Sequence, residues 1–225
     1  MSATAPSTAS SSSSGAKKQR VVIVPGNGCA PVEDANWYCS LRDSLNALPT
    51  SATDRSPAYI AVAETMPDPD EAYERTWLPF IREQLAVDDD TIVVGHSSGA
   101  EAAMRLCEET RVKGLLLVSA CHSDLGMESE AISGYYSRLW QWQRIKDNTR
   151  WIVQLHSTND RLVPVAEARE VAKQLGSEYI EYPNKGHFLK RTMPEVIEIV
   201  ERKRKEEGAA DDAQIRETAA SSAVP

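Results

Sequence analysis

The sequence predicts an α/β protein with a mainly parallel sheet of about six strands, helices on both faces and a minimal cap. Two observations support this fold class. Short runs of β-branched and apolar residues recur without the apolar/polar alternation of a half-exposed strand, which is typical of strands covered on both faces. Segments with helical patterns lie between these runs, so strands and helices alternate as they do in βαβ units.

The expected strands are short and apolar, and in order they are Val21–Val24, Tyr59–Ala63, Thr91–Val94, Leu115–Ser119, Trp151–Leu155 and Glu178–Tyr182. The expected helices between and after them are Asn36–Ala47, a segment opening at Asp68, Ser98–Glu109, Tyr135–Ile145, Val165–Leu175 and Pro194–Lys205. In the segment at Asp68, that residue suits the N-cap, and Pro69 suits the first turn. Pro79 should break or kink this helix.

The chain of 225 residues is long enough for one full-sized domain. We place a single α/β domain at residues 20–205, between two disordered tails at 1–19 and 206–225. Residues 1–16 are nearly all Ser, Ala and Thr with no apolar run, so they do not resemble a secretory signal. A mitochondrial transit peptide is less favoured, because the Arg-rich amphipathic helix is missing.

Charge and cysteine content narrow the possible partners. The net charge is −8, which disfavours nucleic acid or an anionic membrane as the main partner, since both need a basic surface. No apolar run approaches a membrane span. The four cysteines show no CxxC spacing, so we expect no metal site and no cofactor, and a reducing cytoplasmic location fits best.

The stretch "GHSSG" (residues 95–99) joins the third strand to a helix and fits G-x-S-x-G. In this context the pattern is typical of a nucleophile elbow, in which a serine sits on a strained turn between residues without bulky side chains. Such a turn places the Ser97 hydroxyl at a helix N-terminus, where backbone amides favour negative charge. An ordinary tight turn is the alternative for the five-residue pattern alone.

A serine nucleophile needs a base, usually a histidine oriented by a carboxylate. Of the four histidines, only His187, in the loop after the last strand, leaves room for an acid between serine and histidine, the order that α/β-hydrolases use. Asp160 is the only carboxylate in the loop after the fifth strand and is the candidate acid. The alternative is that Asp160 is an ordinary solvated turn residue, since Asn-Asp is common in turns. The predicted catalytic residues are therefore Ser97, Asp160 and His187.

An oxyanion hole needs two backbone donors, and we predict the amides of Ser98 and Asn27. Asn27 lies in "PGNG" (residues 25–28), directly after the first strand. The competing interpretation of this loop is a phosphate cradle. It fails because Pro31 stands where the third glycine of G-x-G-x-x-G is needed and no Walker lysine follows.

The motifs "VIVPGNG", "WLPF", "IVVGHSSGAEAAMR", "SGYYSRLWQWQRIK" and "GHF", in this order, resemble those of the serine hydrolase family of retinoblastoma-binding protein nine. The resemblance covers about residues 20–200. It implies a compact α/β-hydrolase fold and the same triad of Ser97, Asp160 and His187. The L-x-C-x-E motif for pocket proteins is absent, and the corresponding stretch reads "QLAVDDD", so retinoblastoma-protein binding is not carried over.

We expect a small-molecule ester or amide substrate, cleaved through an acyl-enzyme intermediate. Residues 123–148 should form a short cap, in which Trp140 or Trp142 could line the substrate pocket; packing of the cap onto the core is the alternative. A catalytically silent hydrolase-fold protein that acts as a binding module is the alternative function.

Overall fold

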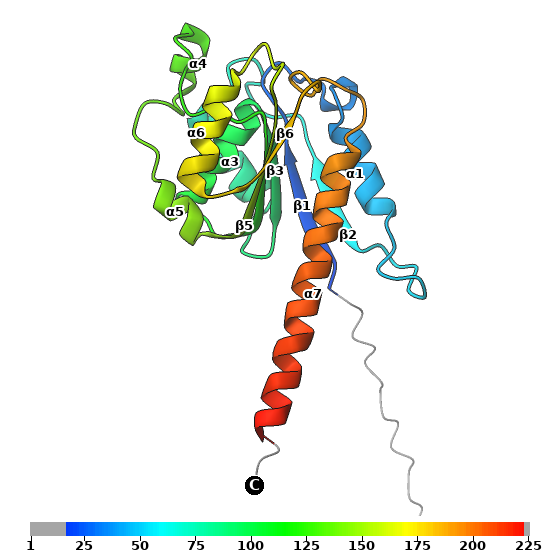
Figure 1. The fold of residues 1–225 in the computed structure, drawn as a ribbon. Coiled ribbons are helices and arrows are strands. Elements are labelled where there is room, and N and C mark those ends of the chain that lie inside the picture. Colours follow the sequence, from blue (N-terminus) through cyan, green and yellow to red (C-terminus); the bar gives the residue numbers. More distant parts are fainter. Residues whose placement is uncertain (1–16, 223–225) are drawn as a thin grey trace, which may run out of the picture.

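The computed structural model describes residues 17–222 and contains one six-stranded sheet in which every strand is parallel to its neighbours (Figure 1). The strand order is β2-β1-β3-β4-β5-β6. The strands are β1 (Gln19–Val24), β2 (Tyr59–Ala63), β3 (Ile92–His96), β4 (Val112–Val118), β5 (Thr149–Ser157) and β6 (Glu178–Tyr182). All six predicted strands are present, and the predicted fold class is confirmed.

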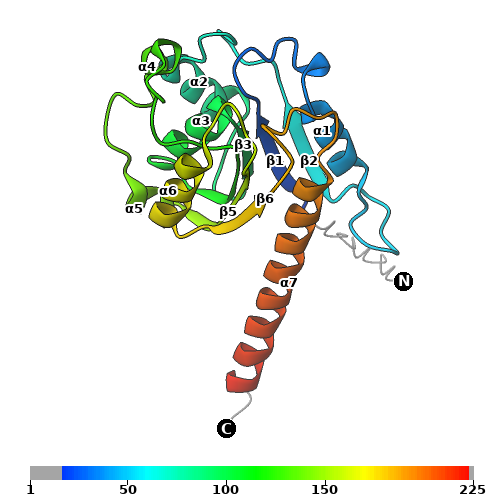
Figure 2. The same ribbon diagram turned by 45° about the horizontal axis from the view of Figure 1, so that its top comes forward.

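The helices are α1 (Tyr38–Ala47), α2 (Glu74–Pro79), α3 (Ser98–Cys107), α4 (Glu128–Ser133), α5 (Trp142–Asp147), α6 (Val165–Leu175) and α7 (Pro194–Ser222). A 3-10 turn at Val32–Asp34 and a π-helical turn at Phe80–Gln84 complete the secondary structure. Helices α1 and α7 cover one face of the sheet, and α2, α3, α5 and α6 cover the other (Figures 1 and 2).

The strands bury alternate residues in two apolar cores, one on each face of the sheet. On β1, for example, Val22 and Val24 point to the side of α3, whereas Val21 and Ile23 point to the side of α1 and α7. Burial on both faces explains why the strand sequences are apolar throughout rather than alternating.

The segment at Asp68 differs from the prediction, because the helix begins at Glu74 rather than beside Pro69. Asp68 has a φ of 44°, and its carbonyl accepts a hydrogen bond from the Ala72 amide at 2.9 Å in a separate turn. The predicted disturbance at Pro79 is present: α2 ends there and passes into the π-helical turn, since proline provides no N–H for the helical ladder.

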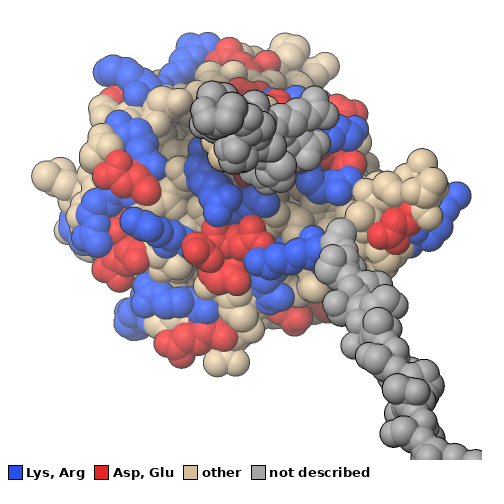
Figure 3. Space-filling model, turned by 90° about the horizontal axis from the view of Figure 1, so that it is seen from below, with Lys and Arg blue, Asp and Glu red and all other residues tan. Residues whose placement is uncertain are grey.

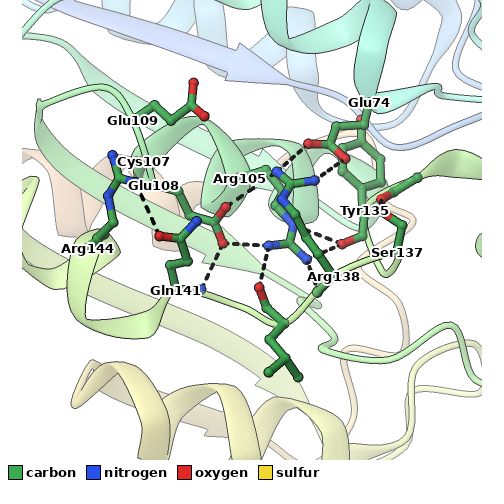
Figure 4. Close-up of polar contacts among 12 residues, drawn as sticks. Glu74, Arg105, Cys107, Glu108, Glu109, Tyr135, Ser137, Arg138, Gln141 and Arg144 are labelled. Carbon is green, nitrogen blue, oxygen red and sulfur yellow. Dashed lines mark hydrogen bonds and ion pairs between the residues drawn. The ribbon is translucent and has the colours of Figure 1, made fainter.

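The predicted helix at Tyr135–Ile145 is wrong. Residues 134–141 are irregular and separate α4 from α5. The buried guanidinium of Arg105, on α3, accounts for this difference (Figure 4). It donates hydrogen bonds to the carbonyl oxygens of Tyr135 at 2.8 Å, Arg138 at 2.7 Å and Leu139 at 3.2 Å. These three carbonyl oxygens therefore accept hydrogen bonds from Arg105 instead of from the backbone amides of a helix.

Two carboxylates complete this network around the cap. Glu108 is 1% exposed, accepts from Arg105 at 2.5 Å and also accepts from the Gln141 amide at 2.9 Å. Glu74, on α2, pairs with the guanidinium of Arg138 at 2.6 and 2.8 Å (Figure 4). The cap is thus held to α3 by hydrogen bonds from Arg105 and to Glu108, and to α2 by the ion pair of Arg138 with Glu74.

The last helix is longer than predicted: α7 continues to Ser222 instead of ending at Lys205, and it projects beyond the sheet (Figure 2). Its first turns pack on the sheet through Val196 and Val200. The following residues are rich in Ala, Glu and other strong helix formers, a propensity that the tail assignment overlooked. The domain limits at 20 and 205 stay predictions, and most of the tail predicted at 1–19 lies outside the described residues.

Charged side chains of both signs are interspersed on the face seen in Figure 3. Several lysines pair with carboxylates: Lys113 lies 3.5 Å from Asp90 and 3.0 Å from Glu207, and Lys203 lies 3.1 Å from Glu178. Within residues 17–222, none of the helices combines the length and the apolar character that crossing a membrane requires.

We predict that Arg105→Met destabilises the protein by about 3–5 kcal/mol, because it removes the nearer of the two cations beside the buried Glu108 carboxylate and the donor to the cap carbonyls. Arg82→Met is the matched control. Its ion pair with Glu109 lies at the surface, so we expect a loss of about 1 kcal/mol or less. Urea unfolding of both variants measures the difference, and equal losses would contradict the role assigned to Arg105.

Candidate active site

The turn after β3 holds Ser97 in a backbone conformation that side-chain-bearing residues rarely adopt, with φ 53° and ψ −129°. The two flanking glycines permit it. A Cβ on Gly95 would lie 2.4 Å from the Gly99 oxygen, and a Cβ on Gly99 would lie 2.3 Å from the Val24 oxygen. The chain can therefore turn from β3 into α3 only because Gly95 and Gly99, two residues before and after Ser97, carry no side chain.

Asp160 and His187 lie in the loops that follow β5 and β6. The carboxyl ends of these parallel strands meet at the same edge of the sheet as the end of β3. There the Asp160 Oδ2 and His187 Nδ1 atoms are 2.8 Å apart, and both side chains are almost fully buried. The structure thus brings together two residues that are distant in the sequence.

The carboxylate of Asp160 is fully hydrogen-bonded. Its Oδ1 atom accepts from the amides of Leu162 at 2.9 Å and Val163 at 3.0 Å, while Oδ2 also accepts from the Ser119 hydroxyl at 2.9 Å. Burial by itself raises the pKa of Asp160, but the hydrogen bond and charge of His187, with the two amides, lower it to about 2. An ionised Asp160 can only accept, so His187 carries its proton on Nδ1 and leaves Nε2 free.

The His187 loop is held to its surroundings by hydrogen bonds on either side of the imidazole. The Gly186 amide donates to Asn159 Oδ1 at 2.7 Å, which ties the histidine loop to the loop of Asp160. The Trp37 indole donates to the Phe188 carbonyl at 3.1 Å, and His96 Nε2 lies 2.9 Å from the His187 carbonyl oxygen. The loop is therefore anchored to α1, to β3 and to the β5 loop.

Ser97 opens into a cavity of about 200 Å³. Across residues 17–222 the structure records no hydrogen bond between its hydroxyl and His187. Asn27 lines the same cavity, and Ser98 is the first residue of α3, where helical amides have no partner within the helix. Of the two residues predicted to form the oxyanion hole, Asn27 therefore lines this cavity and Ser98 directly follows Ser97.

The remaining cavity wall combines acidic and apolar residues. Glu101 and Glu130 contribute carboxyl groups, whereas Met127 and Leu162 are roughly half exposed. Burial raises the pKa of Glu101 well above its ordinary value, although its Oε1 atom accepts a hydrogen bond from the Cys121 amide at 2.8 Å.

The two tryptophans predicted as candidates for the substrate pocket do not line the cavity at Ser97. Trp140 and Trp142 stack with ring centroids 5.4 Å apart and line a larger neighbouring cavity of about 1130 Å³. The Arg105 guanidinium lies 3.7 Å from the Trp140 ring centroid, and the Trp140 indole donates to the His122 carbonyl at 2.8 Å. This arrangement favours the alternative, in which these rings pack the cap onto the core.

Three histidines outside the predicted triad have other partners. His156 Nε2 lies 3.1 Å from the Val163 carbonyl, as expected for a residue that bonds to the backbone. His122 Nδ1 lies 2.7 Å from a carboxylate oxygen of Glu167. His96 is 1% exposed and bonds to Tyr38 as well as to the His187 loop.

Sequence reasoning missed Ser119 and Glu101. Ser119 directly follows β4, the strand between β3 and β5, and that position beside both predicted catalytic strands is the signal that could have found it. Glu101 is four residues after Ser97 on α3, so helical periodicity places both on one face.

Comparison with known proteins gives one family and several similar structures. The sequence pattern of the family described as serine hydrolase matches residues 21–193. Serine hydrolase RBBP9 of Rattus norvegicus is 43% identical over 185 residues, which cover 82% of this chain and 95% of the rat protein. Residues 97, 160 and 187 all lie within the range 21–193 that the family matches.

Solved structures support the α/β-hydrolase fold. The ydeN gene product of Bacillus subtilis is 22% identical, with a TM-score of 0.70 over 82% of this chain and 98% of that chain. Est1E of Butyrivibrio proteoclasticus is 18% identical, with a TM-score of 0.60 over 87% and 90% of the two chains.

The buried His96 generates a prediction about pH. Burial, with the nearby charge of His187, lowers the pKa of His96 from 6.5 to about 3. An imidazole with a lowered pKa takes up its proton on unfolding, so its contribution to stability is complete above pH 6.5 and is lost as the pH falls toward 3.

His96→Gln removes this titration. The free energy of unfolding of the variant should therefore fall less steeply with acid than that of the wild type, by about 1.4 kcal/mol per pH unit between roughly pH 6 and pH 4. The comparison cancels the opposite contribution of Glu101, which both proteins share. Urea unfolding at several pH values measures the slopes, and equal slopes would contradict a neutral His96.

Proposed function

Because the chain belongs to the serine hydrolase family, we propose that it cleaves small ester or amide substrates with Ser97 as nucleophile, His187 as base and Asp160 as the residue that orients the base. The observation that carries the assignment is the hydrogen bond of 2.8 Å between Asp160 and His187, at the sheet edge where Ser97 occupies its strained turn.

In the proposed first step, the Ser97 hydroxyl attacks the substrate carbonyl, and His187 Nε2 accepts its proton. Asp160 stabilises the imidazolium through the Nδ1–H bond. The proton then passes to the leaving alcohol or amine, and an acyl-enzyme remains on Ser97. Water attacks the ester, again with His187 as base, and releases the acid.

The negative oxygen of each tetrahedral intermediate would accept hydrogen bonds from the amides of Ser98 and Asn27. The positive end of the α3 dipole adds to this stabilisation because it points to the Ser97 turn. Loss of one such donor costs about 10²–10³ in rate in comparable enzymes.

The cavity at Ser97 supports a small substrate. Its volume of about 200 Å³ is below the usual range for drug-sized ligands, roughly 300–1,000 Å³. The half-exposed Met127 and Leu162 would contact an apolar group at the entrance.

Ser97→Ala should abolish covalent labelling by a fluorophosphonate probe, because the probe reacts with an activated serine hydroxyl. Ser177→Ala, at the opposite end of the sheet beside the start of β6, is the control and should label like the wild type. Gel fluorescence measures both. Undiminished labelling of the Ser97 variant would rule out Ser97 as the nucleophile, whereas an unlabelled wild type would favour the binding-module alternative.

Asp160→Asn should lower the kcat for p-nitrophenyl ester hydrolysis by about 10⁴, because the amide favours the wrong imidazole tautomer. Steady-state kinetics on a panel of p-nitrophenyl and aminoacyl esters measure the loss, with circular dichroism to verify folding. A folded variant with nearly full activity would remove Asp160 from the mechanism.

A further inference from the structure

We propose that His96 and Tyr38 are positioning residues, which hold the oxyanion loop and the His187 loop in register with the Ser97 turn through one chain of hydrogen bonds. The inference rests on the proposed function, since it assigns these residues to the same reaction.

The chain of hydrogen bonds begins in the loop after β1. The Gly26 amide donates to the Tyr38 hydroxyl oxygen at 3.1 Å, and that hydroxyl lies 2.6 Å from His96 Nδ1. On the other side of the ring, His96 Nε2 lies 2.9 Å from the carbonyl oxygen of His187. A single imidazole thus connects two loops that flank the predicted nucleophile.

The partners at the two ends fix the direction of every bond. A carbonyl oxygen can only accept, so His96 must carry its proton on Nε2. The neutral ring then has a lone pair on Nδ1, and the Tyr38 hydroxyl must donate to it. The Tyr38 oxygen is consequently left to accept from Gly26 and from the Asn36 side chain, 3.2 Å away. For a neutral His96 this is the arrangement that satisfies the carbonyl of His187 and both ring nitrogens, and Cys29 Sγ, 3.6 Å from the Tyr38 oxygen, is then on the donor side of that hydroxyl.

The chain is enclosed, so its geometry is set by packing as well as by hydrogen bonds. Tyr38 is 0% exposed, and His96 is 1% exposed. The His96 ring also packs against Trp37 at 5.6 Å and against His187 at 5.0 Å between ring centroids. In this position His96 cannot reach a substrate, so it acts through the residues it holds.

Residues of this hydrogen-bond chain are adjacent in sequence to proposed catalytic residues. Gly26 precedes Asn27, the proposed oxyanion donor, and His96 precedes Ser97. The carbonyl that His96 binds belongs to His187 itself. Displacement of reacting groups by about 1 Å can lower the rate on the order of 10²-fold, so the relative position of these two loops and the Ser97 turn matters for kcat.

Conservative replacements at position 96 separate positioning from simple filling of space. The Gln side chain can place an N–H near the position of His Nε2, whereas Asn is shorter and reaches only the position of Nδ1. His96→Gln therefore preserves the bond to the His187 loop and removes only the acceptor of the Tyr38 hydroxyl, whose bond from the Gly26 amide does not involve residue 96, whereas His96→Asn breaks the bond to the His187 loop. Both variants are polar and uncharged, but Asn leaves more of the buried site unfilled than Gln, so thermal unfolding is measured beside activity to separate packing from positioning.

We expect His96→Asn to lower kcat by roughly 10² with little change in KM, and His96→Gln to stay within about threefold of the wild type. Steady-state ester hydrolysis and thermal unfolding are measured for both. Equal activity of the two variants, a loss confined to KM, or an activity loss that simply follows the melting temperature would overturn the proposal.

Tyr38→Phe tests the other end of the chain and remains informative if His96→Asn does not fold. It should lower kcat on the order of 10-fold, less than the complete loss of an oxyanion donor. Tyr59→Phe is the matched control, because this buried tyrosine bonds to Glu201 from the start of β2, at the opposite edge of the sheet. If both variants lose the same activity, the proposal is wrong.

One measurement does not depend on turnover. In ¹⁵N-resolved NMR of the wild-type protein, the His96 ring proton should appear on Nε2, and a proton on Nδ1 would overturn the proposal. An inactive wild type with an Nε2 proton would instead refute the proposed hydrolase function while leaving the hydrogen-bond chain intact.

Discussion

The close approach of α3 to the end of β1 is the constraint on which the rest of the site depends. A side chain at Gly99 would collide with the Val24 backbone, and one at Gly95 would collide with α3 itself. Because the helix starts this close to the sheet, the intervening residue, Ser97, must adopt a positive φ and lie at the tip of the turn. The strain is stored where the proposed chemistry needs an accessible hydroxyl.

The same helix also organises the cap. Arg105 lies two turns after Ser97 and binds backbone carbonyls of residues 135–139, so the irregular cap segment is fixed by a buried cation rather than by helix formation. Breaking a buried pair costs more than the pair contributes, because a charge remains without its partner. The cap and the nucleophile turn are therefore positioned by one rigid element.

Asp160 and His96 show how hydrogen bonds to groups of fixed polarity determine protonation. Asp160 is saturated with donors and stays ionised, which assigns the His187 proton to Nδ1. The His187 carbonyl, an obligatory acceptor, assigns the His96 proton to Nε2. The loops after β5 and β6 thus impose opposite tautomers on two neighbouring imidazoles. Of the two rings, His187 is the one whose second nitrogen has no recorded hydrogen bond within residues 17–222.

The sequence by itself determined the six strands, their parallel direction and the three candidate residues, because apolar runs, the alternation of strands with helices and positions at strand ends are local signals. The helix predicted from the sequence at Tyr135–Ile145 is absent, since the buried Arg105, distant in sequence, hydrogen-bonds the backbone carbonyls of that segment. The sequence also indicated no role for His96, whose partners at positions 38 and 187 meet it only when β1, β3 and β6 lie in one sheet. Hydrogen bonds between segments far apart in the chain have no local pattern, and only the tertiary structure decided them.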